Sequence, residues 1–319
     1  MDNTTIIKTQ GLTKIFHEEI AVQDVSMEIP RGAIVGFIGP SGSGKTTTVR
    51  LLTGIYKPTA GSSTVLGYHP GNFTRNIREK IGYMPQLFAL YPELSVWENL
   101  NFAASIYGLN FKNRKAHFNE LLDFVDLTEH KKKLARNLSG GMKRRLSLAA
   151  TLVHSPELIF LDEPTAGIDP VLRRKFWDHF KSLQANGCTL FITTQYVGEA
   201  IYCDLVGVMV EGRIVTMETP ELLRYKAFDG EMVDLHTKQR LIHKDLLQLR
   251  KLPFVRKKNV TRLDGNGVRL VVEKANTAIP ALLEWCNAEF VNVETIEQYL
   301  PPFDDVFVEL VKNVTDNAK

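Results

Sequence analysis

The 319-residue sequence predicts an α/β fold, in which helices cover a parallel sheet and a small α+β unit follows. Two segments, residues 33–39 and 158–162, are strand-like and almost uniformly apolar, and similar segments lie at 189–194 and 206–212. This composition is typical of parallel sheets, because helices cover both of their faces. Such sheets bind ligands where their strands end, so the residues after these segments are candidates for a functional site.

Two changes of pattern predict the domain organisation. Between residues 87 and 155 no comparable strand occurs, and amphipathic segments predict a helical insertion. Beyond Asp229–Gly230 the pattern is strand, helix, strand and helix, without clustered chemistry. We therefore expect a main domain over residues 1–228 and an accessory α+β domain over residues 229–319.

Charge and cysteine content exclude several classes of protein. The net charge is only +3, so the sequence does not predict a nucleic-acid partner, and a basic cluster at residues 143–145 is short. The three cysteines, Cys188, Cys203 and Cys286, fit neither a disulfide framework nor a zinc site. The first ten residues lack the pattern of a secretory signal, and no run approaches the roughly 18 apolar residues of a membrane span. We expect a cytosolic chain, so that any membrane role depends on a partner.

The strongest motif is GPSGSGKTT, which follows the strand at 33–39 and precedes a helical segment. It matches a phosphate-binding loop, in which glycines let backbone N–H groups surround phosphate oxygens at a helix N-terminus. Lys45 would reach the β- and γ-phosphates, and the Thr46 hydroxyl would face Mg²⁺. The alternative is a glycine turn with an unrelated lysine, and a chance match has odds of about one in a hundred. The residues expected to bind nucleotide here are Gly39, Pro40, Ser41, Gly42, Ser43, Gly44, Lys45, Thr46 and Thr47.

A second motif, LIFLDEPTAGIDP at residues 158–170, places two carboxylates at the end of an apolar strand. Asp162 would hold Mg²⁺, and Glu163 would orient or deprotonate an attacking water. The alternative for adjacent acids is a solvated loop, which the wholly apolar strand before them disfavours. The two motifs together predict a P-loop NTPase.

A third motif, NLSGGMKRRLSLAATL, opens an amphipathic helix at Ser139, Gly140 and Gly141. Ser139 suits a helix N-cap, and the two glycines expose the N–H groups of the first turn. A free helix N-terminus binds anions, yet the chain already has one such site for its own nucleotide. Taken alone, the segment could be a capped helix and nothing more.

In their order and spacing the three motifs closely resemble the nucleotide-binding subunit of ABC transporters, over roughly residues 5–225. The resemblance implies a P-loop NTPase core of ABC-transporter type with a helical subdomain, and ATP and Mg²⁺ as ligands. It also implies a head-to-tail dimer, in which Ser139, Gly140 and Gly141 cap the γ-phosphate held by a second ATPase subunit. Whether that second subunit is identical stays open.

Three further residues take roles from the same resemblance. Phe16 resembles the aromatic residue that stacks on adenine, although an aromatic residue at a strand end is also common in a core. Gln86 in YMPQ resembles the glutamine that contacts Mg²⁺ and senses the γ-phosphate. Asp169 in AGIDP resembles the aspartate that communicates across the dimer.

Residues 83–102 and 138–149 most resemble the ATPases of exporters of drugs, lipids, polysaccharides and antibiotics. In that branch a separate permease subunit forms the membrane channel, so the ATPase lies at the cytoplasmic face of the membrane, bound through the permease. The resemblance implies that some aromatic residues between 87 and 111 line the groove for the permease. It does not specify the transported substrate, and importers differ only in direction.

One position departs from the family pattern. Where the family has histidine after the strand at 189–194, in a sequence like TTHYMEEA, this chain has TTQYVGEA with Gln195. Glutamine keeps an N–H donor of similar reach but cannot become a cation. We expect hydrolysis that is slowed and not abolished, because Glu163 is retained. The alternative is that glutamine works equally well in this branch.

Two other classes stay open. Soluble ABC-type ATPases of translation or DNA repair usually carry tandem cassettes or long coiled-coil insertions, and this chain has one cassette. A weakly hydrolysing regulatory subunit would use ATP only to dimerise. The retained acids and lysine favour an ATPase whose catalytic residues are Glu163, Gln195 and Lys45 and whose metal-binding residues are Thr46, Gln86 and Asp162.

Overall fold

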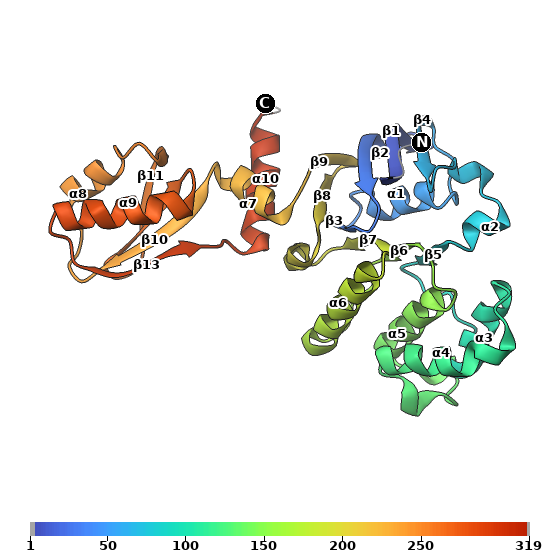
Figure 1. Ribbon diagram of the computed structural model, residues 1–319. Coiled ribbons are helices and arrows are strands. Elements are labelled where there is room, and N and C mark those ends of the chain that lie inside the picture. Colours follow the sequence, from blue (N-terminus) through green and yellow to red (C-terminus); the bar gives the residue numbers. More distant parts are fainter. Residues whose placement is uncertain (1–3, 318–319) are drawn as a thin grey trace. The chain divides into compact units, whose positions relative to one another are not determined.

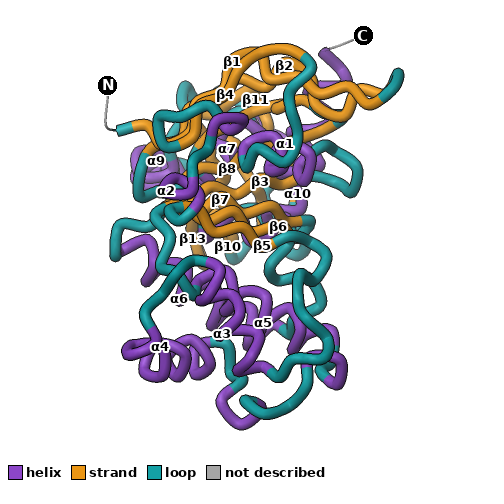
Figure 2. The backbone as a smooth tube through the Cα atoms, turned by 90° about the vertical axis from the view of Figure 1, so that its right-hand side faces the viewer, coloured by secondary structure: helices purple, strands orange, loops and turns teal. Residues whose placement is uncertain are grey.

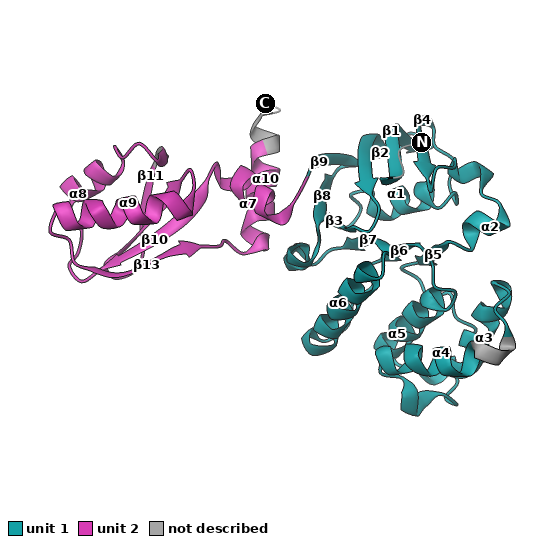
Figure 3. Ribbon diagram, in the orientation of Figure 1, with its two compact units in different colours: residues 1–217 teal, residues 218–319 magenta. Residues whose placement is uncertain are grey.

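The computed structural model describes residues 4–317, without the side chains of residues 111–113, 257–258 and 314–317. It divides into two compact units, residues 1–217 and 218–319, each with its own hydrophobic core (Figure 3). The sequence places the boundary later, after residue 228. The difference is helix α7 (Pro220–Phe228), which packs against α10 (Phe303–Asn317) of the second unit. The functional division into an ATPase domain and an accessory domain stays a prediction.

The first unit is built on a six-stranded sheet with the order β5-β6-β7-β3-β8-β9 (Figure 1). The pairs β5–β6, β6–β7, β7–β3 and β3–β8 are parallel. Every residue of β3, β6 and β7 is buried, as their apolar sequences predict. The strands are β3 (Ile34–Ile38), β5 (Ile81–Met84), β6 (Leu158–Asp162), β7 (Thr189–Thr194), β8 (Leu205–Val210) and β9 (Arg213–Glu218).

A second sheet of this unit is antiparallel, with the order β2-β1-β4, and the sequence analysis does not predict it. Its strands are β1 (Thr5–Phe16), β2 (Glu19–Pro30) and β4 (Ala60–Val65). Helix α1 (Lys45–Leu52) joins it in one core, where Val49 and Leu52 pack with Val22 and Val65. These strands are hard to predict from the sequence because only alternate residues are buried, and several register shifts interrupt the pairing.

Residues 87–155 form helices and short 3₁₀ turns, as the lack of strand-like segments there predicts, and Figure 2 shows α3, α4 and α5 grouped apart from the strands of this unit. Helix α3 begins with a capping box, in which Ser95 Oγ accepts the Glu98 N–H and Glu98 Oε2 accepts the Ser95 N–H.

Among the described residues, no helix is both long and apolar enough to cross a membrane. The helices are α2 (Arg75–Arg78), α3 (Val96–Ile106), α4 (Phe111–Phe124), α5 (Gly140–Leu152) and α6 (Pro170–Ala185), with 3₁₀ turns at Pro70–Asn72, Thr128–His130, Ala135–Asn137 and Val197–Tyr202.

The second unit contains a four-stranded antiparallel sheet with the order β11-β12-β10-β13. With the helices α8 and α9, the chain order around this sheet is β-α-β-β-α-β, which is the ferredoxin-like arrangement. The core lies between the sheet and the helices, where Val233 and Leu270 pack with Leu246 and Leu282. The elements are β10 (Glu231–Thr237), α8 (His243–Leu249), β11 (Val255–Arg262), β12 (Gly267–Val272), α9 (Ala275–Ala288) and β13 (Val293–Tyr299).

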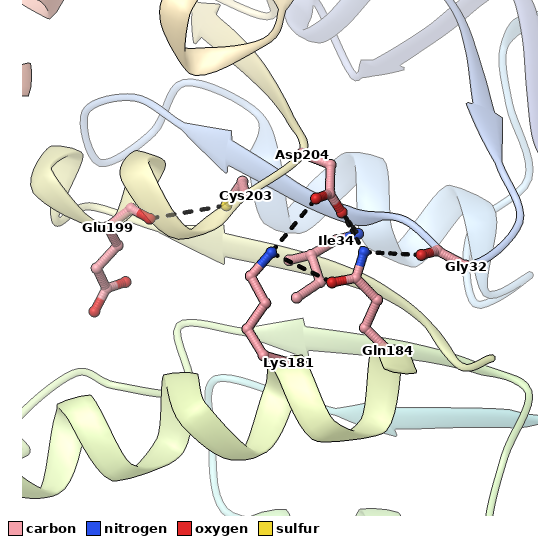
Figure 4. Close-up of polar contacts among 7 residues, drawn as sticks. All are labelled: Gly32, Ile34, Lys181, Gln184, Glu199, Cys203 and Asp204. Atoms are coloured by element: carbon pink, nitrogen blue, oxygen red, sulfur yellow. Dashed lines mark hydrogen bonds and ion pairs between the residues drawn. The ribbon is translucent and has the colours of Figure 1, made fainter. Parts of the chain in front are cut away.

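One carboxylate connects α6 to the central sheet (Figure 4). Asp204 lies just before β8, and its Oδ2 accepts the backbone N–H of Ile34 at 2.7 Å. The same carboxylate accepts a hydrogen bond from Gln184 Nε2 and lies 3.4 Å from Lys181 Nζ, and both side chains come from α6. Gln184 also donates to the Gly32 carbonyl at 2.9 Å. The contacts therefore hold the last turns of α6 at the start of β3.

Asp204→Ala removes the acceptor of the part-buried Ile34 N–H and of Gln184. We expect the free energy of unfolding to fall by about 1–3 kcal/mol, since an unpaired buried donor loses its hydration without compensation. Urea unfolding followed by tryptophan fluorescence measures this. Asp178→Ala, an exposed aspartate on the same helix, is the control. Equal midpoints for the two variants would contradict the role given to Asp204.

Candidate active site

The loop between β3 and α1 encloses the side chain of Lys45. Lys45 Nζ donates to the carbonyls of Gly39 and Pro40, each at 2.8 Å. Gly44 has φ 102°, and a Cβ there would lie 2.4 Å from the Ala21 carbonyl oxygen. Only glycine adopts this conformation beside a neighbouring backbone without strain. The backbone conformation and close packing of the loop therefore require the glycine at position 44 of the motif.

Lys45 is buried, and two opposing effects act on its pKa. Burial lowers the pKa of Lys45, while the nearby carboxylates of Glu163 and Asp162 raise it. An ammonium group in this position attracts anionic ligands that enter the loop.

Asp162 ends strand β6 and is fully buried. Its Oδ1 accepts hydrogen bonds from Thr46 Oγ1 at 3.0 Å and from Thr193 Oγ1 at 2.5 Å. Its Oδ2 is buried and has no hydrogen-bond partner among the described residues. A buried carboxylate oxygen without a donor is free to coordinate a cation.

Thr193 is a site residue that the sequence analysis misses. It is the register partner of Asp162 in the parallel pair β6–β7, which brings its hydroxyl to the carboxylate. The sequence shows only that a threonine lies at the end of an apolar strand. That this threonine contacts Asp162 follows from the pairing of β6 with β7.

Glu163 begins the loop after β6 in a left-handed conformation, with φ 54°. Its N–H donates to the Thr193 carbonyl at 3.0 Å, which supports this uncommon backbone geometry. Its Oε1 accepts from Gln195 Nε2 at 2.6 Å, and its Oε2 accepts from Gln86 Nε2 at 3.1 Å. Three residues chosen separately from the sequence therefore meet at one carboxylate.

Arg144 connects the helix α5 to this acid. Its Nη1 donates to the Glu163 carbonyl at 3.0 Å, and its guanidinium carbon lies 5.4 Å from the centre of the Phe88 ring. Burial lowers the pKa of Arg144, and the charges of Glu163 and Asp162 oppose this. The sequence showed Arg144 only as part of a basic cluster, without a role.

Ser139 and Asp169 both act as helix N-caps. Ser139 Oγ accepts the Met142 N–H at 3.3 Å, and Asp169 Oδ1 accepts the N–H groups of Val171 and Leu172 at 3.1 and 3.0 Å. A Cβ on Gly140 would meet nothing within 4 Å, so the start of α5 is open. Among the described residues, no hydrogen bond joins these two helix starts to the loop at 39–47.

Phe16 ends β1 and is half-buried. Its ring meets the Tyr56 ring edge-on with centres 5.2 Å apart, and Lys14 Nζ lies 4.9 Å from the Phe16 ring centre. The sequence analysis does not identify Tyr56 or Lys14. Whether Phe16 stacks on adenine stays a prediction.

The aromatic residues after residue 87 divide between core and surface. Trp97 packs on Phe118 with ring centres 5.1 Å apart, whereas Tyr91 and Phe102 meet at 4.3 Å and are both exposed.

A separate surface cavity of about 640 Å³ lies beside α1, α2, β5 and the end of α3. It is lined by Thr53, Ile55, Phe73, Arg75, Arg78, Glu79, Ile81, Tyr83, Ile106 and Tyr107.

The parallel sheet, the phosphate-type loop and the acids at the end of β6 define a P-loop nucleoside triphosphatase. The family model of the ABC transporter matches residues 22–166. Over 308 residues the chain is 31% identical to the linearmycin resistance ATP-binding protein LnrL of Bacillus subtilis, covering 96% of this chain and 98% of that protein. It is 37% identical to the daunorubicin resistance ATP-binding protein DrrA3 of Streptomyces coeruleorubidus, over 72% of this chain and 73% of that protein. It is also 36% identical to the probable multidrug ABC transporter ATP-binding protein YbhF of Escherichia coli, but spans only 41% of that protein's length.

Solved structures agree with these relatives. The structure of an ATP-binding subunit of an ABC transporter matches with a TM-score of 0.65 at 26% identity, over 70% of this chain and 93% of that chain. A dimeric post-hydrolysis ATP-binding cassette bound to ADP and Pi matches with a TM-score of 0.63 at 26% identity, over 67% and 98%. The chain therefore belongs to the family of ABC transporter ATP-binding subunits. This confirms the predicted fold class and nucleotide-binding class, whereas the roles of individual residues stay predictions.

Thr193→Val removes the hydroxyl that holds Asp162 but keeps the size and shape of the side chain. We expect the Mg²⁺ concentration needed for tight binding of a fluorescent ATP analogue to rise about tenfold or more, because outer partners of a metal ligand set its orientation. Titration of Mg²⁺ at fixed nucleotide measures this. Thr64→Val, on an exposed position of β4, is the matched control. An unchanged titration for Thr193→Val would show that Asp162 does not depend on this bond.

Proposed function

We propose that the chain hydrolyses ATP and thereby powers export of a substrate through a separate membrane permease. The observation that carries the proposal is the carboxylate of Glu163, held by Gln86 and Gln195 beside Lys45 and Asp162. This is a general base next to a site for phosphate and metal, which is what hydrolysis of a phosphoanhydride needs. In the proposal Lys45 binds the β- and γ-phosphates, and the backbone of residues 39–47 surrounds them.

The residues present fit Mg²⁺. Asp162 offers the unpartnered Oδ2, and the Thr46 hydroxyl lies against the same carboxylate. Mg²⁺ in such sites takes one or two protein oxygens and completes its shell with phosphates and water, so a single buried carboxylate suffices. Gln86 would add its amide oxygen. The ion would neutralise charge on the β- and γ-phosphates.

Glu163 positions and deprotonates the attacking water in this proposal. The two amides that hold its carboxylate are neutral donors, so they orient Glu163 without the charge that a cationic partner would add. Gln195 occupies the place where the family has histidine. It can sense the γ-phosphate by a hydrogen bond, but it cannot stabilise developing negative charge as an imidazolium would.

A second ATPase subunit, identical or different, would complete the site. The helix start at Ser139, Gly140 and Gly141 is open, and no residue of the chain's own phosphate loop bonds to it among the described contacts. Its free N–H groups suit a γ-phosphate supplied from outside the chain. The similar cassette in a dimeric state supports this arrangement. Asp169, which caps α6, would lie at the same dimer contact.

Export through a permease is supported by the names of the relatives. LnrL is named a linearmycin resistance protein, DrrA3 a daunorubicin resistance protein, and YbhF a probable multidrug ABC transporter ATP-binding protein. We place the chain at the cytoplasmic face of the membrane, bound through the permease. The cavity beside α2 and the end of α3 is lined by apolar side chains together with Arg75, Arg78 and Glu79, and it suits an amphipathic segment of that partner.

Gln195→His tests the effect of the glutamine on hydrolysis. We expect kcat to rise, by less than the roughly hundredfold that loss of a whole preorganised donor costs, because the imidazole restores a donor that can become cationic. Steady-state ATP hydrolysis by the subunit in complex with its permease measures this. Glu163→Gln is the inactive control. Equal rates for wild type and Gln195→His would mean that glutamine performs the role equally well.

Ile106→Glu tests the permease groove. Ile106 is more than half exposed and lines the cavity, so a buried charge there would oppose docking of an apolar segment. We expect loss of membrane co-fractionation with ATP binding by the isolated subunit unchanged. Ile20→Glu, at a half-exposed isoleucine of β2 that does not line the cavity, is the control. Co-fractionation of the Ile106 variant at the wild-type level would exclude this cavity as the docking site.

A further inference from the structure

A partly buried ion pair involves Glu199, four residues after Gln195. Glu199, in the 3₁₀ turn Val197–Tyr202, is 3% exposed, and Arg173 of α6 places its Nε 3.6 Å from Glu199 Oε1. Neither oxygen of Glu199 has a hydrogen-bond partner among the described residues. A carboxylate in this position depends on a nearby cation, because burial without hydrogen bonds strongly disfavours the ionised form.

Arg173 makes two further contacts from the same guanidinium. Its Nη2 donates to the Ile168 carbonyl at 3.3 Å, one residue before Asp169. Its central carbon lies 4.1 Å from the centre of the Tyr196 ring, one residue after Gln195. A planar guanidinium that stacks on a ring and donates at its edge is held in one orientation, which a lysine would not reproduce.

Two hydrogen bonds hold the short segment from Tyr196 to Glu199 in a turn. The Glu199 N–H donates to the Tyr196 carbonyl at 3.0 Å, and the Tyr196 N–H donates to Thr194 Oγ1 at 3.0 Å. Contacts to Tyr196 and Glu199 therefore fix the backbone that leads out of Gln195. Through Gln195 Nε2 they act on Glu163 Oε1, 2.6 Å away.

We propose that Arg173 is a positioning residue that couples the loop of Asp169 to Gln195 and hence to Glu163. The inference rests on the proposed hydrolysis of ATP. A shift of the loop at Ile168 and Asp169 moves the start of α6, and Arg173 carries that shift to Tyr196 and Glu199. The amide of Gln195 then approaches or leaves the carboxylate of Glu163. Contact with a second subunit at Asp169 thus adjusts the catalytic carboxylate without touching it.

The test compares Arg173→Gln with the double variant Arg173→Gln/Glu199→Gln, and uses Arg174→Gln, the exposed neighbour on α6, as the control. Three quantities are measured: kcat and KM for ATP in the assembled complex, the melting temperature, and hydrogen exchange of residues 195–202. We expect kcat of Arg173→Gln to fall roughly tenfold or more, because small misplacements of catalytic groups are costly, with KM changed by less than about twofold. Exchange of residues 195–202 should rise, and the control should match wild type in all three.

The double variant separates positioning from stability. It leaves no uncompensated charge, so the melting temperature should recover while kcat stays low, because the contacts to Ile168 and Tyr196 are still missing. Recovery of kcat together with the melting temperature would overturn the inference, as would an unchanged kcat in Arg173→Gln. If wild type hydrolyses ATP no faster than Glu163→Gln, the proposed function fails. In that case raised exchange in Arg173→Gln would still establish that Arg173 holds residues 195–202, while the absence of hydrolysis would reject its positioning role in catalysis.

Discussion

The hydrogen bond from Thr193 Oγ1 to Asp162 Oδ1, 2.5 Å long, joins the neighbouring strands β6 and β7 at the end where the site lies. Asp162 is fully buried, and an ionised carboxylate there is costly unless donors or a cation compensate for lost hydration. Thr46 supplies a second donor from the first turn of α1. The Asp162 carboxylate is thus bonded both to the neighbouring strand and to the helix that follows the phosphate loop. A slip of one residue between the strands, about 3.3 Å, would separate them.

The next residue, Glu163, depends on the same strand. Its N–H bonds to the Thr193 carbonyl, and this holds the left-handed backbone that turns its side chain toward Gln86 and Gln195. The carbonyl of Glu163 accepts from Arg144, so helix α5 also contacts the acid. Glu163 is therefore hydrogen-bonded to helix α5, to strand β7 and to the residues Gln86 and Gln195.

Much of the fold could be predicted because its signals are contiguous. The buried strands β3, β6 and β7 are runs of apolar residues, and the predicted segments match their bounds closely. Strands β1, β2 and β4 were missed because they are half-exposed and irregularly paired. Strand β11, with the sequence VRKKNVTR at the edge of its sheet, was missed because its charged residues interrupt the apolar pattern expected of a strand. The boundary between the units shifted because α7 packs on α10, a contact between segments far apart in the chain.

The sequence by itself determined the local chemistry of this protein: the phosphate loop with its glycines, Asp162 and Glu163 at the end of a strand, and the helix cap Ser139. These features depend on neighbouring residues and on backbone preferences, which a short stretch of sequence contains. Only the tertiary structure decided which side chains hold Glu163, since Gln195 and Gln86 lie 32 and 77 residues away along the chain. It also decided that Thr193 and Arg144 contact the two acids. Their positions follow from strand order, register and helix packing, and no local pattern encodes those long-range relations.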